Sequence, residues 1–350
     1  MNEELLGKVI LKNGYSQFRL RQAKKNVFTR LIESWDAATD LPEDLRALLA
    51  REVPIESLSA RLLVESAKKD TLKALFATRD GLFIEVVLMR HDRDRRTVCV
   101  SSQAGCPMKC SFCATGKLGF KRNLTAEEVV DQVLFFARLL NKKRESVTNV
   151  VYMGMGEPMN NYDNVMVSIR ALNDKDGLNL GARHISISTC GIVPGIKKFA
   201  KEKLQVNLAI SLHAADDKTR SRLMPVNEAY PLGKLMKAAG EYAVATRRKV
   251  MFEYILISGV NDSDEHARSL AALMGKNKLY HVNLIKYHET FAKGGTAPAC
   301  PATAAVFRAP ARERMNRFFD ILKKSGVSCT FRVSFGEDIA GACGQLAPKE

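Results

Sequence analysis

The stretch Cys106-Pro-Met-Lys-Cys110-Ser-Phe-Cys113 carries more information about this chain than any other part of its sequence. Its three thiols have the spacing to bind three irons of a four-iron cluster, which leaves the fourth iron without a protein ligand. Clusters that only carry electrons are usually held by four cysteines. A zinc site would need a second knuckle, and the sequence has neither another Cys-x-x-Cys nor a histidine at finger spacing. The motif therefore predicts a cluster with an open iron, with a zinc loop or a chance group of core cysteines as alternatives.

A regular alternation of strand and helix patterns surrounds this loop. One helix opens with the capping box Thr125-Ala-Glu-Glu128. Alternation of this kind indicates parallel strands joined by helical crossovers. We therefore expect an α/β fold, a partial barrel of the (β/α)6 type, with an open doubly wound sheet as the alternative. The strands are expected near residues 97–101, 149–153, 184–189, 206–212, 250–257, 281–286 and 328–333.

Unusual polar motifs follow the first four of these strands. The cysteine loop comes after the first, Gly154-Met-Gly-Glu-Pro158 after the second, Ser188-Thr-Cys-Gly191 ends the third, and Ser211-Leu-His213 ends the fourth. The carboxyl ends of parallel strands meet at one edge of a sheet, where active sites of such folds lie. The motifs are therefore expected to form a single site.

The chain before this core has a different character. Residues 1–70 are expected to form a small helical, basic accessory domain, in which Pro42 suits the first turn of a helix. Residues 71–91 predict a β-hairpin linker with a tight turn at Asp80-Gly81. The core follows over 92–338, and residues 339–350 form a C-terminal segment. The basic side chains of the N-terminal helices face either RNA or water, and they are Arg19, Arg21, Lys24, Lys25 and Arg30.

Composition narrows the class of protein. The 350 residues contain 54 Lys and Arg against 38 Asp and Glu, a net charge of +16, which favours a polyanionic partner such as nucleic acid over a solvated basic surface. No apolar run is long enough to span a membrane and no signal peptide is evident, so we expect a cytoplasmic protein. In that compartment the eight cysteines are expected to be reduced thiols, ligands or catalysts rather than a disulfide scaffold.

These motifs together resemble the radical S-adenosylmethionine (SAM) superfamily. Within it the chain is similar to the RlmN/Cfr family of RNA methyltransferases, which methylate adenosine in 23S ribosomal RNA. The resemblance runs from about Tyr15 to Leu346, and Cys99 and Cys343 in their contexts narrow it to this family. Besides the cluster loop, it rests on Cys99-Val-Ser-Ser-Gln103, Met153-Gly-Met-Gly-Glu-Pro158, Ser211-Leu-His-Ala214, Val282-Asn-Leu-Ile285 and Ala342-Cys-Gly-Gln-Leu346.

The resemblance implies two cofactors, a 4Fe-4S cluster on Cys106, Cys110 and Cys113, and SAM on the open iron. His288 stands where the family usually has asparagine, because this chain reads Val282-Asn-Leu-Ile-Lys-Tyr-His288. A histidine also has the hydrogen-bonding groups to replace that asparagine. The implied SAM contacts are Gly156, Glu157, Ser188, Ser211, Leu212, His213 and His288.

The resemblance also implies three catalytic residues. Cys343 accepts a methyl group from a first SAM, which requires a thiolate. A second SAM supplies the radical that activates this group toward adenine C2. Cys99 then resolves the protein–RNA crosslink through a transient disulfide with Cys343. Glu85 matches the family's general base, although it lies one residue further from Cys99 than the family pattern.

Each assignment has a simpler alternative. Cys99 has the setting of a small core residue, Glu85 that of a solvent-facing strand residue, and His213 that of a structural histidine. Cys190, Cys300 and Cys329 match no expected role. The stretch 292–310 is longer than the family pattern and is either a loop over the site or a surface insertion.

The expected partners are 23S rRNA, with tRNA as a second candidate, and an electron donor such as flavodoxin; no membrane is expected, and we expect a monomer. The alternative within the family is a C8 methyltransferase of the Cfr type, which has the same cysteines. Two hypotheses lie outside the family: a radical SAM enzyme acting on a peptide or small molecule, and a non-catalytic RNA-binding metalloprotein.

Overall fold

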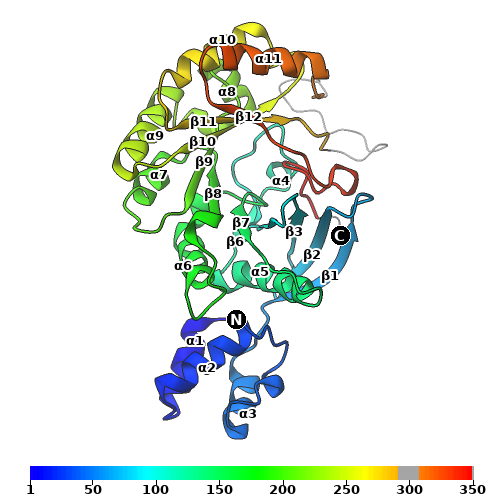
Figure 1. Cartoon of the computed structure of the whole chain (residues 1–350), viewed down its shortest axis with the longest axis vertical. Coiled ribbons are helices and arrows are strands. Elements are labelled where there is room, and N and C mark those ends of the chain that lie inside the picture. The colour runs from blue at the N-terminus through cyan, green and yellow to red at the C-terminus, as the bar shows by residue number, and fades with distance from the viewer. Residues whose placement is uncertain (291–306, 349–350) are drawn as a thin grey trace.

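A ten-stranded mixed sheet organises the computed structural model, which describes residues 1–290 and 307–348 (Figure 1). Cys300 and most of the stretch 292–310 therefore lie outside the described residues. In sheet order the strands are β1 (Leu58–Glu65), β2 (Thr71–Thr78), β3 (Phe83–Arg90), β4 (Arg96–Cys99), β7 (Asn149–Tyr152), β8 (Ile185–Thr189), β9 (Asn207–Ser211), β10 (Val250–Leu256), β11 (Tyr280–Lys286) and β12 (Cys329–Phe331).

From β4 to β12 all neighbouring strands are parallel and follow one another in chain order, which confirms the expected α/β core. In the described part of the chain β1 and β12 do not pair, so the sheet is an open, partial barrel. The expected capping box is present, since Thr125 Oγ1 accepts from the backbone of Glu128. The crossovers contain α5 (Ala126–Asn141), η2 (Pro158–Asn161), α6 (Tyr162–Asn173), η3 (Ala182–His184), α7 (Val193–Phe199), α8 (Asp217–Leu223), η4 (Pro225–Asn227), α9 (Leu232–Thr246), α10 (Asp264–Met274) and α11 (Arg312–Lys324).

The two faces of the curved sheet carry different structure. Helices α6, α7, α9, α10 and α11 lie along its outer side, whereas the C-terminal segment, red in Figure 1, lies on the inner side near α4. The connection from β4 to α5 forms a small substructure of β5 (Gln103–Gly105), α4 (Ala114–Lys117) and β6 (Phe120–Asn123). The 3-10 turn η5 (Glu337–Ile339) opens the C-terminal segment.

The N-terminal helices form a lobe below the sheet in the view of Figure 1. The region 1–70 was expected to be helical, but its last part is not. The helices end at Glu52, and β1 then pairs with β2, so the hairpin β2–β3 is part of a three-stranded antiparallel extension of the main sheet. The expected turn at Asp80-Gly81 is present between β2 and β3. The lobe contains α1 (Glu3–Lys12), α2 (Gln17–Phe28), η1 (Trp35–Ala37) and α3 (Glu43–Glu52).

A buried ion pair and two partly buried ones fix this lobe to the core. The N-terminal amine lies 2.7 Å from Asp131 Oδ1 on α5, with both groups buried. Lys24 on α2 binds both Glu3 and Asp174.

Among the described residues, no helix combines the length and apolar character that a bilayer span requires.

Candidate active site

A cavity of ≈ 190 Å³ lies at the carboxyl ends of the parallel strands. Every parallel strand contributes a residue from or just beyond its carboxyl half, from Cys99 of β4 to Arg332 after β12. The strand ends therefore meet around one cavity, where the sequence predicted a single site. Of the expected site residues, those that line the cavity are Cys99, Cys106, Cys110, Cys113, Gly156, Glu157, Ser188, Ser211, His213, His288 and Cys343.

The cysteine loop is held from both sides. Ser111, between Cys110 and Cys113, donates from its backbone to the carbonyl of Leu223 at the end of α8, at 3.0 Å. Cys113 is the N-cap residue of α4. Lys109 has a φ of 52°, a left-handed conformation that is costly outside glycine and turns the chain sharply.

The three thiols suit a cluster better than a single ion. Burial raises the pKa of Cys106 to about 12 and that of Cys110 well above its usual range, so holding them as thiolates requires nearby positive charge, which irons provide. Among the described residues no three His, Cys, Asp or Glu side chains converge on a point where they could hold one metal ion. A four-iron cluster needs no such convergence, because each cysteine binds a different iron.

The loop after β7 needs glycine at two positions. A Cβ on Gly154 would lie 2.7 Å from the carbonyl oxygen of Val100, and one on Gly156 would lie 2.6 Å from Cβ of Gln103. Gly156 also has a φ of 101°. The side-chain oxygen of Gln103 accepts the backbone N–H of Glu157 at 2.9 Å. Close packing of these two segments thus positions Glu157 in the cavity wall.

The carboxylate of Glu157 is buried and already accepts two hydrogen bonds from the backbone. Its two oxygens accept backbone N–H groups of Met159 at 3.0 Å and Cys190 at 2.7 Å. Burial nevertheless raises its pKa. The carboxylate faces the cavity and keeps acceptor capacity, because each oxygen has a second lone pair.

The strand ends β8 and β9 present Ser188 and Ser211 to the cavity, whereas Leu212 is fully buried and does not line it. His213 has a left-handed φ of 59°. Its Nδ1 accepts the backbone N–H of Ile255 at 3.0 Å, and burial lowers its pKa to about 3. His213 is thus a neutral structural histidine that also faces the ligand space.

His288 is almost completely buried at the cavity wall, and its Nε2 lies 2.9 Å from Ser334 Oγ. Its Nδ1 lies 3.4 Å from Glu337 Oε2, without the alignment of a hydrogen bond. Burial lowers the pKa of His288, so it is neutral near pH 7 and has one ring nitrogen available as an acceptor or donor.

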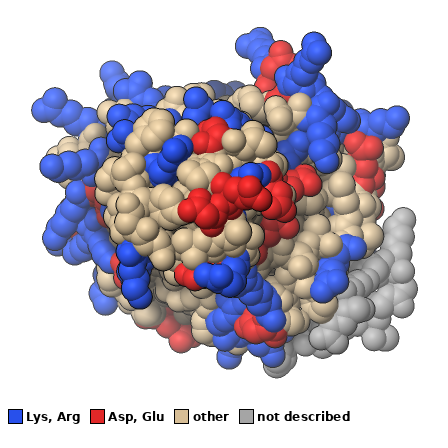
Figure 2. All heavy atoms as spheres, turned by 90° about the horizontal axis from the view of Figure 1, so that it is seen from below, with Lys and Arg blue, Asp and Glu red and all other residues tan. Residues whose placement is uncertain are grey.

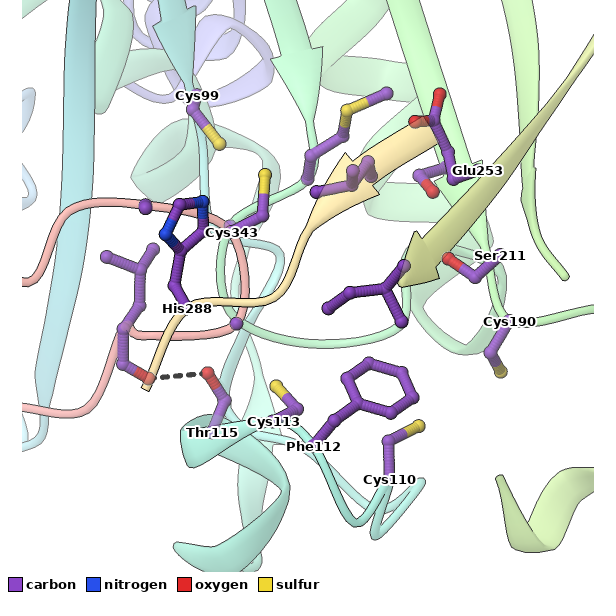
Figure 3. Close-up of a pocket in the computed structure, with 18 of the residues that line it drawn as sticks. Cys99, Cys110, Phe112, Cys113, Thr115, Cys190, Ser211, Glu253, His288 and Cys343 are labelled. Atoms are coloured by element: carbon purple, nitrogen blue, oxygen red, sulfur yellow. Dashed lines mark hydrogen bonds between the residues drawn. The ribbon is translucent and has the colours of Figure 1, made fainter. Parts of the chain in front are cut away.

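Cys99 and Cys343 lie at the same side of the cavity, with side chains that point into the same space (Figure 3). They come from elements more than two hundred residues apart in the chain, and both are free thiols. Burial, and then the neighbouring Cys343, raises the pKa of Cys99 to about 12. All the described cysteines are free, so the structure does not show the transient disulfide that the resemblance implies for these two residues.

The C-terminal segment binds directly to the chain that follows the cluster loop. Ala114 donates its N–H to the carbonyl of Gly344 at 2.8 Å. Thr115 Oγ1 donates to the carbonyl of Leu346 at 2.6 Å (Figure 3). Cys343 is therefore fixed over the cysteine loop.

Glu85 does not line the cavity. It lies on β3, buried, with its carboxylate 2.8 Å from Lys73 Nζ and accepting the N–H of Ala347 at 2.8 Å. It is on the same face of β3 as Val87, which does line the cavity, and the C-terminal segment covers it.

Sequence reasoning missed two charged residues of the cavity wall, Arg332 and Glu253. Arg332 Nη1 lies 3.4 Å from Glu253 Oε2 and 3.3 Å from the sulfur of Met153. The neighbouring Cys343, and then Glu253, raises the pKa of Arg332, which is therefore a permanent cation beside the thiol pair. Each is a charged residue in or beside an apolar strand, and only this placement in the sequence could have indicated that it belongs to the site. Cys190, which matched no role, also lines the cavity.

The fold and this site define a radical SAM enzyme. A family model described as the Radical SAM superfamily matches residues 100–271. A radical SAM methyltransferase from Sphaerobacter thermophilus, known from a crystal structure, superposes with a TM-score of 0.91 at 45% identity, covering 99% of this chain and 97% of that chain.

Curated relatives narrow the class. A probable dual-specificity RNA methyltransferase RlmN from Thermoanaerobacter sp. (strain X514) is 42% identical over 349 residues, which is 100% of this chain and 97% of the relative. One of the same name from Staphylococcus aureus (strain JH9) is 43% identical over 341 residues, covering 97% and 90%. The chain belongs to the RlmN family of radical SAM RNA methyltransferases. Its cofactors are accordingly a 4Fe-4S cluster and SAM.

Proposed function

We propose that this enzyme methylates C2 of an adenosine in 23S rRNA, with an adenosine of tRNA as a second substrate. One observation carries the proposal: two free thiols, Cys99 and Cys343, share a cavity with the three cluster cysteines. A radical SAM enzyme that only cleaves SAM has no need of this pair. Adenine C2 is electron-poor and cannot attack a sulfonium methyl directly, so a carrier and a radical are both required.

The cluster and SAM together supply a 5′-deoxyadenosyl radical, and the residues of the chain do the rest. Cys106, Cys110 and Cys113 hold the irons. Gly156, Glu157, Ser188, Ser211, His213 and His288 contact SAM, with Leu212 contributing only its backbone, because its side chain is buried in the core.

In this proposal Cys343 acts first, as a thiolate that displaces the methyl group from one SAM. A hydrogen atom is then removed from the S-methyl group, and the resulting carbon radical bonds to adenine C2. Arg332 keeps a positive charge beside the Cys343 sulfur throughout. Burial raises the pKa of Cys99 to about 12, so Cys99 is not a thiolate near pH 7.

Release of the product needs Cys99 and Glu85. The adduct formed at C2 would give up one electron, which would return to the cluster, and Glu85 would take the C2 proton. Cys99 would then lose its proton and attack the Cys343 sulfur, so that the sulfur–carbon bond breaks with its electron pair left on the carbon and a disulfide forms. The freed carbon takes a proton and becomes the methyl group. Glu85 reaches the nucleobase only if the contact with Ala347 opens, because the C-terminal segment covers its carboxylate.

The test compares Cys343→Ala with Cys329→Ala, a buried cysteine of β12 outside the cavity. Anaerobic enzyme with four irons is given SAM, reductant and 23S rRNA, and mass spectrometry maps the methylated position. We expect methylation at C2 in wild type and Cys329→Ala, and loss to background in Cys343→Ala with SAM cleavage retained. Methylation by Cys343→Ala would refute the carrier role. A methyl group at C8 would assign the chain to the other activity of the family, and a colourless, air-stable zinc protein would refute the enzyme altogether.

A further inference from the structure

Arg220, on α8, is the largest fully buried side chain in the described part of the protein. It does not line the cavity and has no exposed surface. A buried arginine is normally paired with a carboxylate, because an unpaired charge is costly to remove from water. The groups around Arg220 therefore show whether its charge is neutralised within the protein.

All partners of the Arg220 guanidinium are neutral. The nearest carboxylate on its own helix, Asp217, is occupied instead by the Asn227 side chain at 3.0 Å and the Leu232 N–H at 2.8 Å. No carboxylate of the described residues lies within ion-pair distance of Arg220. The acceptors are the carbonyls of Cys190 at 2.7 Å, Leu212 at 3.2 Å, Ser211 at 3.3 Å and Tyr230 at 3.4 Å, with the Asn227 side chain at 2.8 Å.

The position of Arg220 points to the missing negative charge. Its Nη2 bonds the carbonyl of Cys190, a cavity residue beside Cys110. Its helix ends at Leu223, whose carbonyl accepts both the N–H and the hydroxyl of Ser111, inside the cysteine loop. Arg220 thus lies on the helix whose end holds the cysteine loop, and it bonds a residue that packs beside Cys110.

Direct binding of SAM does not account for Arg220. Each of its three guanidinium nitrogens donates to a protein oxygen, and the side chain has no access to the cavity. Its charge acts through space, which is effective in a buried setting of low polarity.

We propose that Arg220 is the built-in counter-charge of the iron–sulfur cluster and raises its reduction potential. Three thiolates outweigh the positive charge of the cluster core, and the electron from a one-electron donor makes it more negative still. A fixed cation stabilises the reduced form more than the oxidised form, and net charge is among the factors that set such potentials. Arg220 is therefore a positioning residue for electron transfer, whichever RNA the enzyme modifies.

The experiment separates charge from hydrogen bonding. Arg220→Gln removes the charge, Arg220→Lys keeps it but loses the forked hydrogen bonds, and Arg222→Gln removes an exposed charge two residues away on the same helix. Each protein is reconstituted anaerobically without RNA, and the cluster is titrated with dithionite and followed by electron paramagnetic resonance.

For Arg220→Gln we expect at least a tenfold lower ratio of reduced to oxidised cluster at a fixed potential, which is about 59 mV for one electron. Arg220→Lys and Arg222→Gln should titrate as wild type. If Arg220→Gln fails to assemble four irons, Arg220→Lys decides: assembly with the wild-type potential supports the charge role. A wild-type potential in Arg220→Gln, an equal shift in Arg220→Lys, or cluster loss in both Arg220 variants would overturn the proposal. None of these readouts depends on RNA methylation, so they are independent of the proposed function.

Discussion

Gly156 has a conformation and a neighbour that exclude any side chain. Its positive φ and its contact with Gln103 mean that alanine there would displace Glu157, whose N–H binds the Gln103 side chain. Backbone strain of this kind costs about 1–3 kcal/mol. Gly156→Ala should therefore weaken SAM binding about tenfold or more, measured anaerobically by calorimetry.

Gly233→Ala in α9 is the matched control, because a Cβ there would contact nothing within 4 Å and alanine favours a helix. We expect its SAM affinity to equal that of wild type. Equal affinity in Gly156→Ala would contradict the role given to this glycine.

At the scale of residues, the sequence predicted those groups whose position follows from strand order. Ser188 and Ser211 lie at the carboxyl ends of expected strands, so the meeting of parallel strand ends placed them in one site. Glu253 and Arg332 could not be found in this way. Their roles depend on an ion pair between β10 and the chain after β12, and a charged residue in a strand reads as solvent-facing without that contact.

At the scale of elements, the seven parallel strands were all predicted, because short stretches of apolar and β-branched residues alternate there with helical patterns. Strand β1 was missed since it is an edge strand with most side chains exposed and no clean alternation. The short strands β5 and β6 were missed as well, since their pairing depends on close contact of Gly105 with Gly119.

The basic residues of helix α2 differ in burial and in pairing. Lys24 is partly buried and paired with Glu3 and Asp174, whereas Arg21 and Lys25 are exposed. Figure 2, seen from the end of the molecule that carries this lobe, shows Lys and Arg mainly around the rim and Asp and Glu across the middle. An RNA contact would therefore use the rim rather than the whole lobe.

We expect Arg21→Glu with Lys25→Glu to raise the KM for RNA several-fold at low salt, with SAM affinity unchanged, because phosphate contacts depend on charge. Lys24→Glu should instead lower the unfolding temperature by breaking a partly buried pair. The double variant Lys276→Glu with Lys278→Glu, exposed beyond α10, controls for net charge. If the two double variants changed the KM for RNA equally, the exposed basic residues of α2 would be part of a solvated surface and not an RNA contact.

At the scale of the whole molecule, a buried histidine, His213, and a half-buried one, His91, make stability depend on pH. Burial lowers the pKa of His213 to about 3 and of His91 to about 4. Both remain neutral in the folded protein while the unfolded chain becomes protonated below about 6.5. Their contribution is therefore fully present above that pH and is lost as the pH falls from about 6.5 toward 3.

The free energy of unfolding should thus fall between pH 7 and pH 5.5, by about 1 kcal/mol for His213 alone. Anaerobic denaturant titrations at the two pH values measure this. His213→Gln should show a drop smaller by about that amount, and an unchanged drop would mean that His213 becomes protonated in the folded state.

The C-terminal segment holds Cys343 through hydrogen bonds to Ala114 and Thr115, the two residues directly after Cys113. Any disorder that air or iron starvation causes in the loop will therefore propagate to the tail of the chain. In the proposed mechanism, damage to the cysteine loop would therefore also displace the methyl carrier Cys343, so that a molecule unable to cleave SAM would not use SAM to methylate Cys343.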